Sequence, residues 1–159
     1  MKAIIIMGSK SDLDFAKRIA KKLEEFGVKY EFRIASAHKT PERVLEILRS
    51  YEDVVFITVA GRSNALSGFV DANTPYPVIA CPPYSDKFAG VDVFSSLRMP
   101  SGVAPMVVLE PENCALAVAK IVALRDEEVR RRVEEYQRRK KEEVIRADEE
   151  ISHGSGDKV

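Results

Sequence analysis

Close to the N-terminus the chain reads Ala3-Ile4-Ile5-Ile6-Met7-Gly8-Ser9-Lys10-Ser11-Asp12. The first five residues of this stretch are all apolar, which is typical of a parallel strand that is buried on both faces of a sheet. The glycine and serines that follow predict a turn, and a helical pattern begins directly after it. A buried strand, a polar turn and a helix form the repeating unit of α/β proteins.

Short apolar segments of the same kind recur along the chain. They predict further strands at 30–35, 54–60, 77–81 and 105–109. Because these segments alternate with helical patterns, we predict an α/β fold with three layers. It contains a doubly wound, parallel, five-stranded sheet of the flavodoxin or Rossmann type.

The predicted helices lie between these strands. The first has one apolar stripe and ends at Gly27, and the stripe consists of Phe15, Ile19, Leu23 and Phe26. Thr40 and Pro41 are typical of the N-cap and the first residue of the second helix. After the fifth strand, a helix is predicted over 111–124.

Composition excludes several classes of protein. The 159 residues include 25 basic and 25 acidic side chains, and this balance argues against a nucleic-acid partner. No apolar run is long enough to cross a membrane, and the first one is too short for a signal peptide. We therefore expect a cytoplasmic protein. Cys81 and Cys114 form neither a disulfide framework nor a Cys-x-x-Cys metal site.

The C-terminal part of the chain differs from the rest. Residues 1–125 predict one globular domain, and 126–150 predict a long, charged helical extension of it, since 18 of those 25 residues are charged. The thin apolar stripe of this helix begins with Val129 and Val133. We expect it to lie across a neighbouring subunit or to project into solvent. Residues 151–159 are expected to form a disordered tail.

Ligands of doubly wound sheets bind beyond the carboxyl ends of the strands, so the turns there are candidate sites. The backbone N–H groups and serines of the first turn suit a phosphate, and Asp12 suits sugar hydroxyls. In an alternative interpretation, Ser11 or Asp12 only caps the helix.

The second turn is Ser36-Ala37-His38-Lys39-Thr40-Pro41. His38 is the one histidine of the body of the chain and the only credible acid–base group. Alternatively, it only donates a hydrogen bond to a loop carbonyl.

The third turn, Gly61-Arg62-Ser63-Asn64-Ala65, allows close approach to a small ligand. In the other interpretation, Ser63 or Asn64 only caps the next helix. Cys81 has no base other than His38, which argues against a nucleophilic cysteine. A metal site has almost no support.

The first two turns together resemble the signature loops of the aminoimidazole ribonucleotide carboxylase family of purine biosynthesis. The resemblance covers residues 1 to about 125. One class of this family is a mutase that moves a carboxylate from N5 to C4, and the other takes carbon dioxide directly. Lys39, the short third loop and the segments 76–83 and 95–102 are similar to the direct carboxylases, whereas mutases typically have arginine after the histidine and a longer loop ending in His-Leu-Pro-Gly.

The resemblance implies roles for individual residues. Ser9, Ser11 and Lys39 would hold the 5′-phosphate and Asp12 the ribose, while Ser36 would shape its loop against the ring. His38 would be the general acid–base at C4 of the imidazole. The carbon dioxide or new carboxylate would be held by the third loop, through Ser63 and the backbone around Gly61 and Ala65, and Arg62 would be a further substrate-binding residue of the same loop.

The family also implies what else takes part. Carbon dioxide is a substrate, no metal, biotin or ATP is needed, and a homo-oligomer, typically an octamer, is expected. Two alternatives remain: the mutase on the same fold, and a non-catalytic nucleotide- or phosphate-binding module.

Overall fold

The computed structural model describes residues 1–154 and contains a five-stranded, all-parallel sheet. Its strand order is β2-β1-β3-β4-β5. The strands are β1 (Lys2–Met7), β2 (Tyr30–Ile34), β3 (Val54–Val59), β4 (Val78–Ala80) and β5 (Met106–Val107). All six residues of β3 are buried, as expected for a central strand that is covered on both faces.

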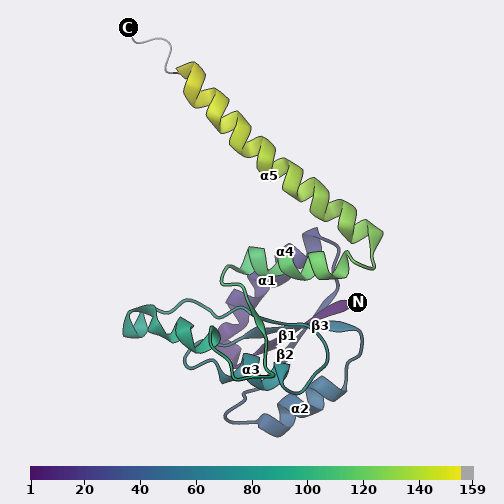
Figure 1. Ribbon diagram of the computed structural model, residues 1–159, viewed down its shortest axis with the longest axis vertical. Helices are drawn as coiled ribbons and strands as arrows, with labels where there is room; N and C mark the ends of the chain where they lie inside the picture. Colours follow the sequence, from purple (N-terminus) through teal and green to yellow (C-terminus); the bar gives the residue numbers. More distant parts are fainter. Residues whose placement is uncertain (155–159) are drawn as a thin grey trace.

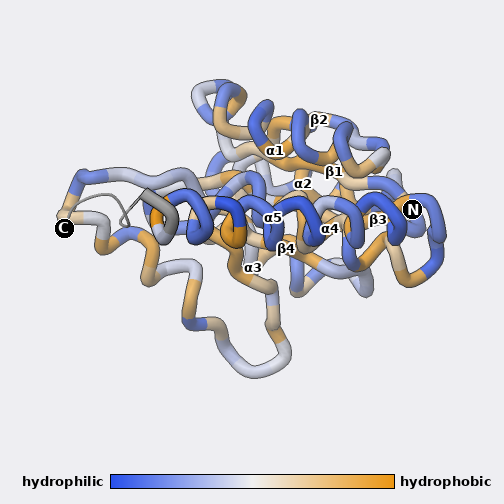
Figure 2. Tube along the Cα trace, turned by 90° about the horizontal axis from the view of Figure 1, so that it is seen from above, coloured by the Kyte–Doolittle hydropathy of each residue, from blue (hydrophilic) through white to orange (hydrophobic). Residues whose placement is uncertain are grey.

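Helices cover both faces of the sheet (Figure 1). One face carries α1 (Leu13–Glu25) and α4 (Pro111–Val122), and the other carries α2 (Pro41–Arg49) and α3 (Ala65–Asp71). Each face has its own apolar core, and hydrophobic residues gather along the central strands in Figure 2. The predicted three-layer, flavodoxin-like fold is therefore confirmed.

The region around β5 differs most from the prediction. The expected strand 105–109 is reduced to Met106–Val107 at the edge of the sheet. Pro105 has no N–H to donate to a neighbouring strand, although the N–H of Val108 still bonds the carbonyl of Ala80 at 3.0 Å. The preceding segment η2 (Lys87–Ser96) forms 3-10 turns that no sequence pattern predicted.

Gly27 ends α1 as predicted. Its φ of +73° is the left-handed conformation that glycine adopts without strain, and its N–H bonds the carbonyl of Glu24 at 2.9 Å. The chain then reverses into β2, and the guanidinium of Arg132 packs against this glycine.

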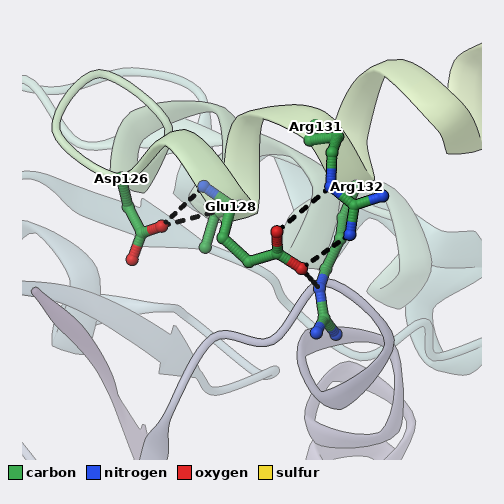
Figure 3. A network of polar contacts seen from close by, with 5 residues as sticks. Asp126, Glu128, Arg131 and Arg132 are labelled. Carbon is green, nitrogen blue, oxygen red and sulfur yellow. Dashed lines mark hydrogen bonds and ion pairs between the residues drawn. The ribbon is translucent and has the colours of Figure 1, made fainter.

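The long C-terminal helix, α5 (Glu127–Gly154), begins with a side-chain cap. The Asp126 carboxylate accepts hydrogen bonds from the N–H groups of Glu128 and Val129, each at 3.1 Å (Figure 3). The Glu128 carboxylate in turn pairs with Arg131 and Arg132. These ion pairs hold the pKa of Glu128 down to about 2.

The first turns of α5 pack on the domain's own core, which the sequence analysis did not expect. Val129 and Val133 are buried. The ring of Tyr136 packs edge-on against the ring of Phe26, with 5.2 Å between the two ring centroids. The remainder of the helix projects away from the domain and is largely hydrophilic (Figures 1 and 2). At the start of the helix, the thin apolar stripe therefore packs against the core of its own domain.

The helix also extends past its predicted end. It reaches Gly154, so the first four residues of the expected disordered tail are helical. Residues 155–159, the rest of that expected tail, lie outside the described residues. Within residues 1–154, no helix combines the length and the apolar character that crossing a membrane requires.

Candidate active site

The loops after β1, β2, β3 and β4 enclose a cavity of about 530 Å³ at the carboxyl edge of the sheet. All ten residues that the sequence analysis proposed line this cavity: Ser9, Ser11, Asp12, Ser36, His38, Lys39, Gly61, Arg62, Ser63 and Ala65. The topology thus brings together turns that lie far apart in the sequence. Their individual roles stay predictions.

The first loop is held by a reciprocal pair of side chains. The Ser9 hydroxyl accepts a hydrogen bond from the N–H of Ser11 at 3.1 Å, and the Asp12 carboxylate accepts one from the N–H of Ser9 at 3.0 Å. This is a capping box, so capping does occur here, but the capping hydroxyl belongs to Ser9. Both Ser9 and Asp12 nevertheless border the cavity.

Asp12 lies in an unfavourable place for a charge. Partial burial raises the pKa of its carboxyl above the ordinary value, although hydrogen bonds from Ser9 and the positive charge of Arg62 lower it. Only the Oδ2 atom has a hydrogen-bond partner within the described part of the chain. The Oδ1 atom is therefore available to accept hydrogen bonds from a ligand.

The second loop is built by Ser36. Its hydroxyl accepts a hydrogen bond from the N–H of Lys39 at 3.2 Å, and its carbonyl accepts one from the N–H of Thr40 at 2.9 Å. The Thr40 hydroxyl accepts a hydrogen bond from the N–H of Ser36 at 3.0 Å. Thr40 is therefore the N-cap residue of α2, but its side chain does not cap the helix.

His38 is at the tip of this loop. Its exposed imidazole makes no hydrogen bond with any of the described residues, which argues against the alternative that it only serves a loop carbonyl. The side chain is therefore free to exchange a proton with a ligand in the cavity.

Hydrogen bonds of Asn64 hold the third loop in place. Asn64 is buried and caps α3 by accepting a hydrogen bond from the N–H of Ser67 at 3.2 Å. Its own N–H and side-chain amide donate to the hydroxyls of Ser95 and Ser96 at 2.8 and 2.9 Å. Asn64 is thus structural, whereas Ser63, with a φ of +45°, borders the cavity.

The fourth loop contributes residues that sequence reasoning missed: Pro83, Tyr84, Ser85 and Lys87. In this turn the sequence analysis considered only Cys81 as a reactive group. Cys81 is fully buried and does not line the cavity. Cys114 is buried in the apolar core. Pro83, Tyr84 and Ser85 follow β4 directly, so the rule that ligands bind beyond the carboxyl ends of parallel strands could have found these three.

The lining has an excess of positive charge. Lys39, Arg62 and Lys87 come from three different loops, and Asp12 is the one carboxylate among the lining residues. Such a field attracts anions such as phosphate esters. No group of three or more His, Cys, Asp or Glu side chains within residues 1–154 is placed to hold a metal ion.

Comparisons with known proteins agree with this geometry. A family model described as AIR carboxylase matches residues 2–143. A protein of Archaeoglobus fulgidus named phosphoribosylaminoimidazole carboxylase is 71% identical over 153 residues, which cover 95% of this chain and 85% of the relative. A protein of the same name from Treponema denticola is 50% identical over 152 residues, covering 93% and 96%. The crystal structure of Treponema denticola PurE superposes with a TM-score of 0.91 at 49% identity, covering 94% of this chain and 97% of that one.

Proposed function

Because the chain belongs to the AIR carboxylase family, we propose that it joins carbon dioxide itself to C4 of aminoimidazole ribonucleotide in purine biosynthesis. The observation that carries the proposal is the convergence of three kinds of group on one cavity: an imidazole without a hydrogen-bond partner among residues 1–154, three cations and the Asp12 carboxylate. A binding module would have use for the cations but not for an imidazole free to exchange protons. The proposal therefore favours an enzyme.

The nucleotide would be held by the first two loops. Ser9, Ser11 and Lys39 would contact its phosphate, and the free oxygen of Asp12 would accept hydrogen bonds from the ribose hydroxyls. Because the capping box and the Ser36 hydrogen bonds hold these loops through their own residues, little ordering would be needed on binding.

The chemistry itself would need little more than positioning. The aminoimidazole ring is an electron-rich enamine, so its C4 can attack the carbon of carbon dioxide and form the new C–C bond directly. The cationic intermediate then loses its C4 proton to His38, which restores the aromatic ring. This sequence of steps consumes no ATP and calls for no metal or biotin.

The third loop would hold the gas and the carboxylate that forms from it. Ser63 offers a hydroxyl, and Gly61 and Ala65 offer close approach to the backbone. The guanidinium of Arg62 would stabilise the negative charge that develops on the two oxygens as the C–C bond forms.

The choice of the direct carboxylase over the mutase rests on this loop and on Lys39. The loop has five residues, Ala60 to Asn64, and Asn64 already caps α3. The chain thus lacks the longer loop ending in His-Leu-Pro-Gly that is typical of the mutases. The relatives at 71% and 50% identity are also named carboxylases.

A comparison of two substrates tests the proposal. Aminoimidazole ribonucleotide and its N5-carboxyamino derivative are offered separately, and formation of the 4-carboxy nucleotide is followed. We expect product from the first in the presence of carbon dioxide. Rapid conversion of the second in buffer depleted of carbon dioxide would instead establish the mutase.

A further inference from the structure

The third loop has one buried residue among exposed neighbours. Arg62, Ser63 and Ala65 are exposed and line the larger cavity, whereas Asn64 is 3% exposed and does not line it. A polar side chain that is buried needs hydrogen-bond partners, because an unpaired polar group inside a protein costs free energy. The partners of Asn64 therefore show what holds this loop.

Two of these partners belong to η2, a segment far away in the sequence. The N–H of Asn64 donates a hydrogen bond to the Ser95 hydroxyl at 2.8 Å, and its side-chain amide donates one to the Ser96 hydroxyl at 2.9 Å. Ser96 is 1% exposed, and the Ser95 hydroxyl in turn donates to the carbonyl of Asp92 at 2.7 Å. The two serines lie 31 and 32 residues after Asn64. These bonds therefore connect the third loop to the segment that carries Lys87.

The backbone of the third loop has a conformation that needs such support. Ser63 has a φ of +45°, in a region that residues with a Cβ atom rarely adopt. Asn64 follows with φ −67° and ψ 80°, and the N–H of Ala65 donates to the carbonyl of Ser63 at 2.7 Å, which is an inverse γ-turn. Strained conformations persist where surrounding contacts hold them. The bonds from Asn64 to η2 are contacts of this kind, one residue from Ser63.

Asn64 also caps α3, but it does so with a different atom. Its Oδ1 accepts the hydrogen bond from the N–H of Ser67, whereas its Nδ2 donates to Ser96. Removal of the Ser96 hydroxyl therefore weakens the connection to η2 and leaves the cap of α3 in place. The two roles of Asn64 can thus be separated by substitution.

We propose that Asn64 is a positioning residue, which connects the third loop to η2 and thereby holds Arg62 and Ser63 in place at the cavity. The inference rests on the proposed function for the part that these two residues take in the reaction. Reacting groups must be closely aligned, and a displacement of about 1 Å can cost about 10²-fold in rate even when its cause lies far from the chemistry. Asn64 itself contacts no substrate and acts only through its neighbours.

The Ser96→Ala variant tests the inference by kinetics. Formation of the 4-carboxy nucleotide is followed with whichever of the two nucleotides the wild type converts. We expect kcat to fall about tenfold or more, since the groups of the third loop lose their alignment. The KM for the nucleotide should stay close to the wild-type value, because the first two loops are proposed to hold its phosphate and ribose.

Asn73→Ala is the matched control. It also removes a side-chain amide near α3, but the lost bond, from Nδ2 of Asn73 to the carbonyl of Phe69 at 2.7 Å, lies after the other end of the helix. Asn73 is exposed and does not line the cavity. This variant should keep the wild-type kcat and KM, even where its thermal midpoint falls as far as that of Ser96→Ala.

A double variant shows whether the effect passes through the bond between Asn64 and Ser96. Residues that act through one shared contact have non-additive effects. The kcat of the Asn64→Ala, Ser96→Ala double variant should therefore be close to that of Asn64→Ala alone. Two losses that multiply would mean that the residues act independently, and would overturn the inference.

Hydrogen exchange measures the loop directly and needs no activity. The backbone N–H groups of residues 62–65 should exchange faster in Ser96→Ala than in the wild type or in Asn73→Ala. Unchanged exchange, or faster exchange with the wild-type kcat, would overturn the inference. If Ser96→Ala does not fold, Ser95→Ala, which removes the acceptor of the Asn64 N–H, is judged by the same criteria.

Failure of the proposed function gives a different result. A wild type that converts only the N5-carboxyamino nucleotide would overturn the direct use of carbon dioxide, and the kinetic test of Asn64 would then proceed with that nucleotide. A wild type that converts neither nucleotide would overturn both the proposed function and this inference.

Discussion

The N–H of Ser9 donates a hydrogen bond to Oδ2 of Asp12, with 3.0 Å between the nitrogen and the oxygen. This contact joins two residues that are proposed to bind different groups of the same nucleotide. Ser9 is proposed to contact the phosphate and Asp12 the ribose. Because both partners of this contact belong to the same loop, the distance between the two subsites is set by the fold. The same contact keeps a partly buried carboxylate where its charge is disfavoured.

The raised pKa of Asp12 predicts a pH-dependent effect on stability. A carboxyl whose pKa is raised on folding lowers stability as the pH rises from its ordinary value of 3.8 through its raised folded value. The Asp12→Asn variant removes this charge and keeps an oxygen that can accept from Ser9. Its thermal midpoint should exceed that of the wild type at pH 7, and the difference should shrink as the pH falls toward 3.8.

The same variant should bind the nucleotide more weakly, since an amide oxygen accepts weaker hydrogen bonds from hydroxyls than a carboxylate does. Thermal melting across pH and a nucleotide titration check the two effects. A thermal midpoint at pH 7 at or below that of the wild type would contradict the first.

Substitution of His38 separates binding from catalysis. The His38→Asn variant should lose about 10²- to 10⁴-fold in kcat, the usual contribution of a general acid–base group. Its fold should be unaffected, because the imidazole has no hydrogen-bond partner in residues 1–154. Nucleotide affinity should change little. Turnover near the wild-type rate would remove His38 from the mechanism.

The two parts of α5 should respond differently to change. Tyr136→Ala removes the edge-on contact with Phe26, and such contacts contribute about 0.5–1.5 kcal/mol beyond area burial. The urea midpoint should therefore fall. A chain ended after Gln137 keeps this contact and loses the projecting part, which we propose serves assembly with other copies. Light scattering should then give fewer subunits per particle, and an unchanged number of subunits would contradict that role.

Much of the fold follows from the sequence because parallel strands and amphipathic helices have strong patterns. The buried run 54–60 and the Thr40-Pro41 start of α2 fall within one or two residues of the observed bounds. The η2 segment could not be predicted, since its positive φ at Phe88 and Ala89 has no residue signature. Val129 and Val133 look like a thin stripe in isolation, and only the tertiary structure shows that they cover the domain's own core.

The candidate site was predictable to the extent that topology determines it. The rule that ligands bind at the carboxyl ends of parallel strands brought Ser9, His38 and Ser63 to one edge without knowledge of any contact. The rule gives no side-chain detail, so it could not show that Asn64 is anchored while Ser63 borders the cavity. Lys87 was missed because the irregular η2 segment carries it.

We propose carbon dioxide from solution as the second substrate of this enzyme. The most direct measurement is the initial rate of carboxylation of aminoimidazole ribonucleotide as dissolved carbon dioxide is varied, with carbonic anhydrase present to keep it in equilibrium with bicarbonate. We expect a rate that rises with carbon dioxide and saturates. Without carbonic anhydrase, freshly added carbon dioxide should support a faster initial rate than freshly added bicarbonate. No turnover of this nucleotide at any level of carbon dioxide, with rapid turnover of the N5-carboxyamino nucleotide, would contradict it.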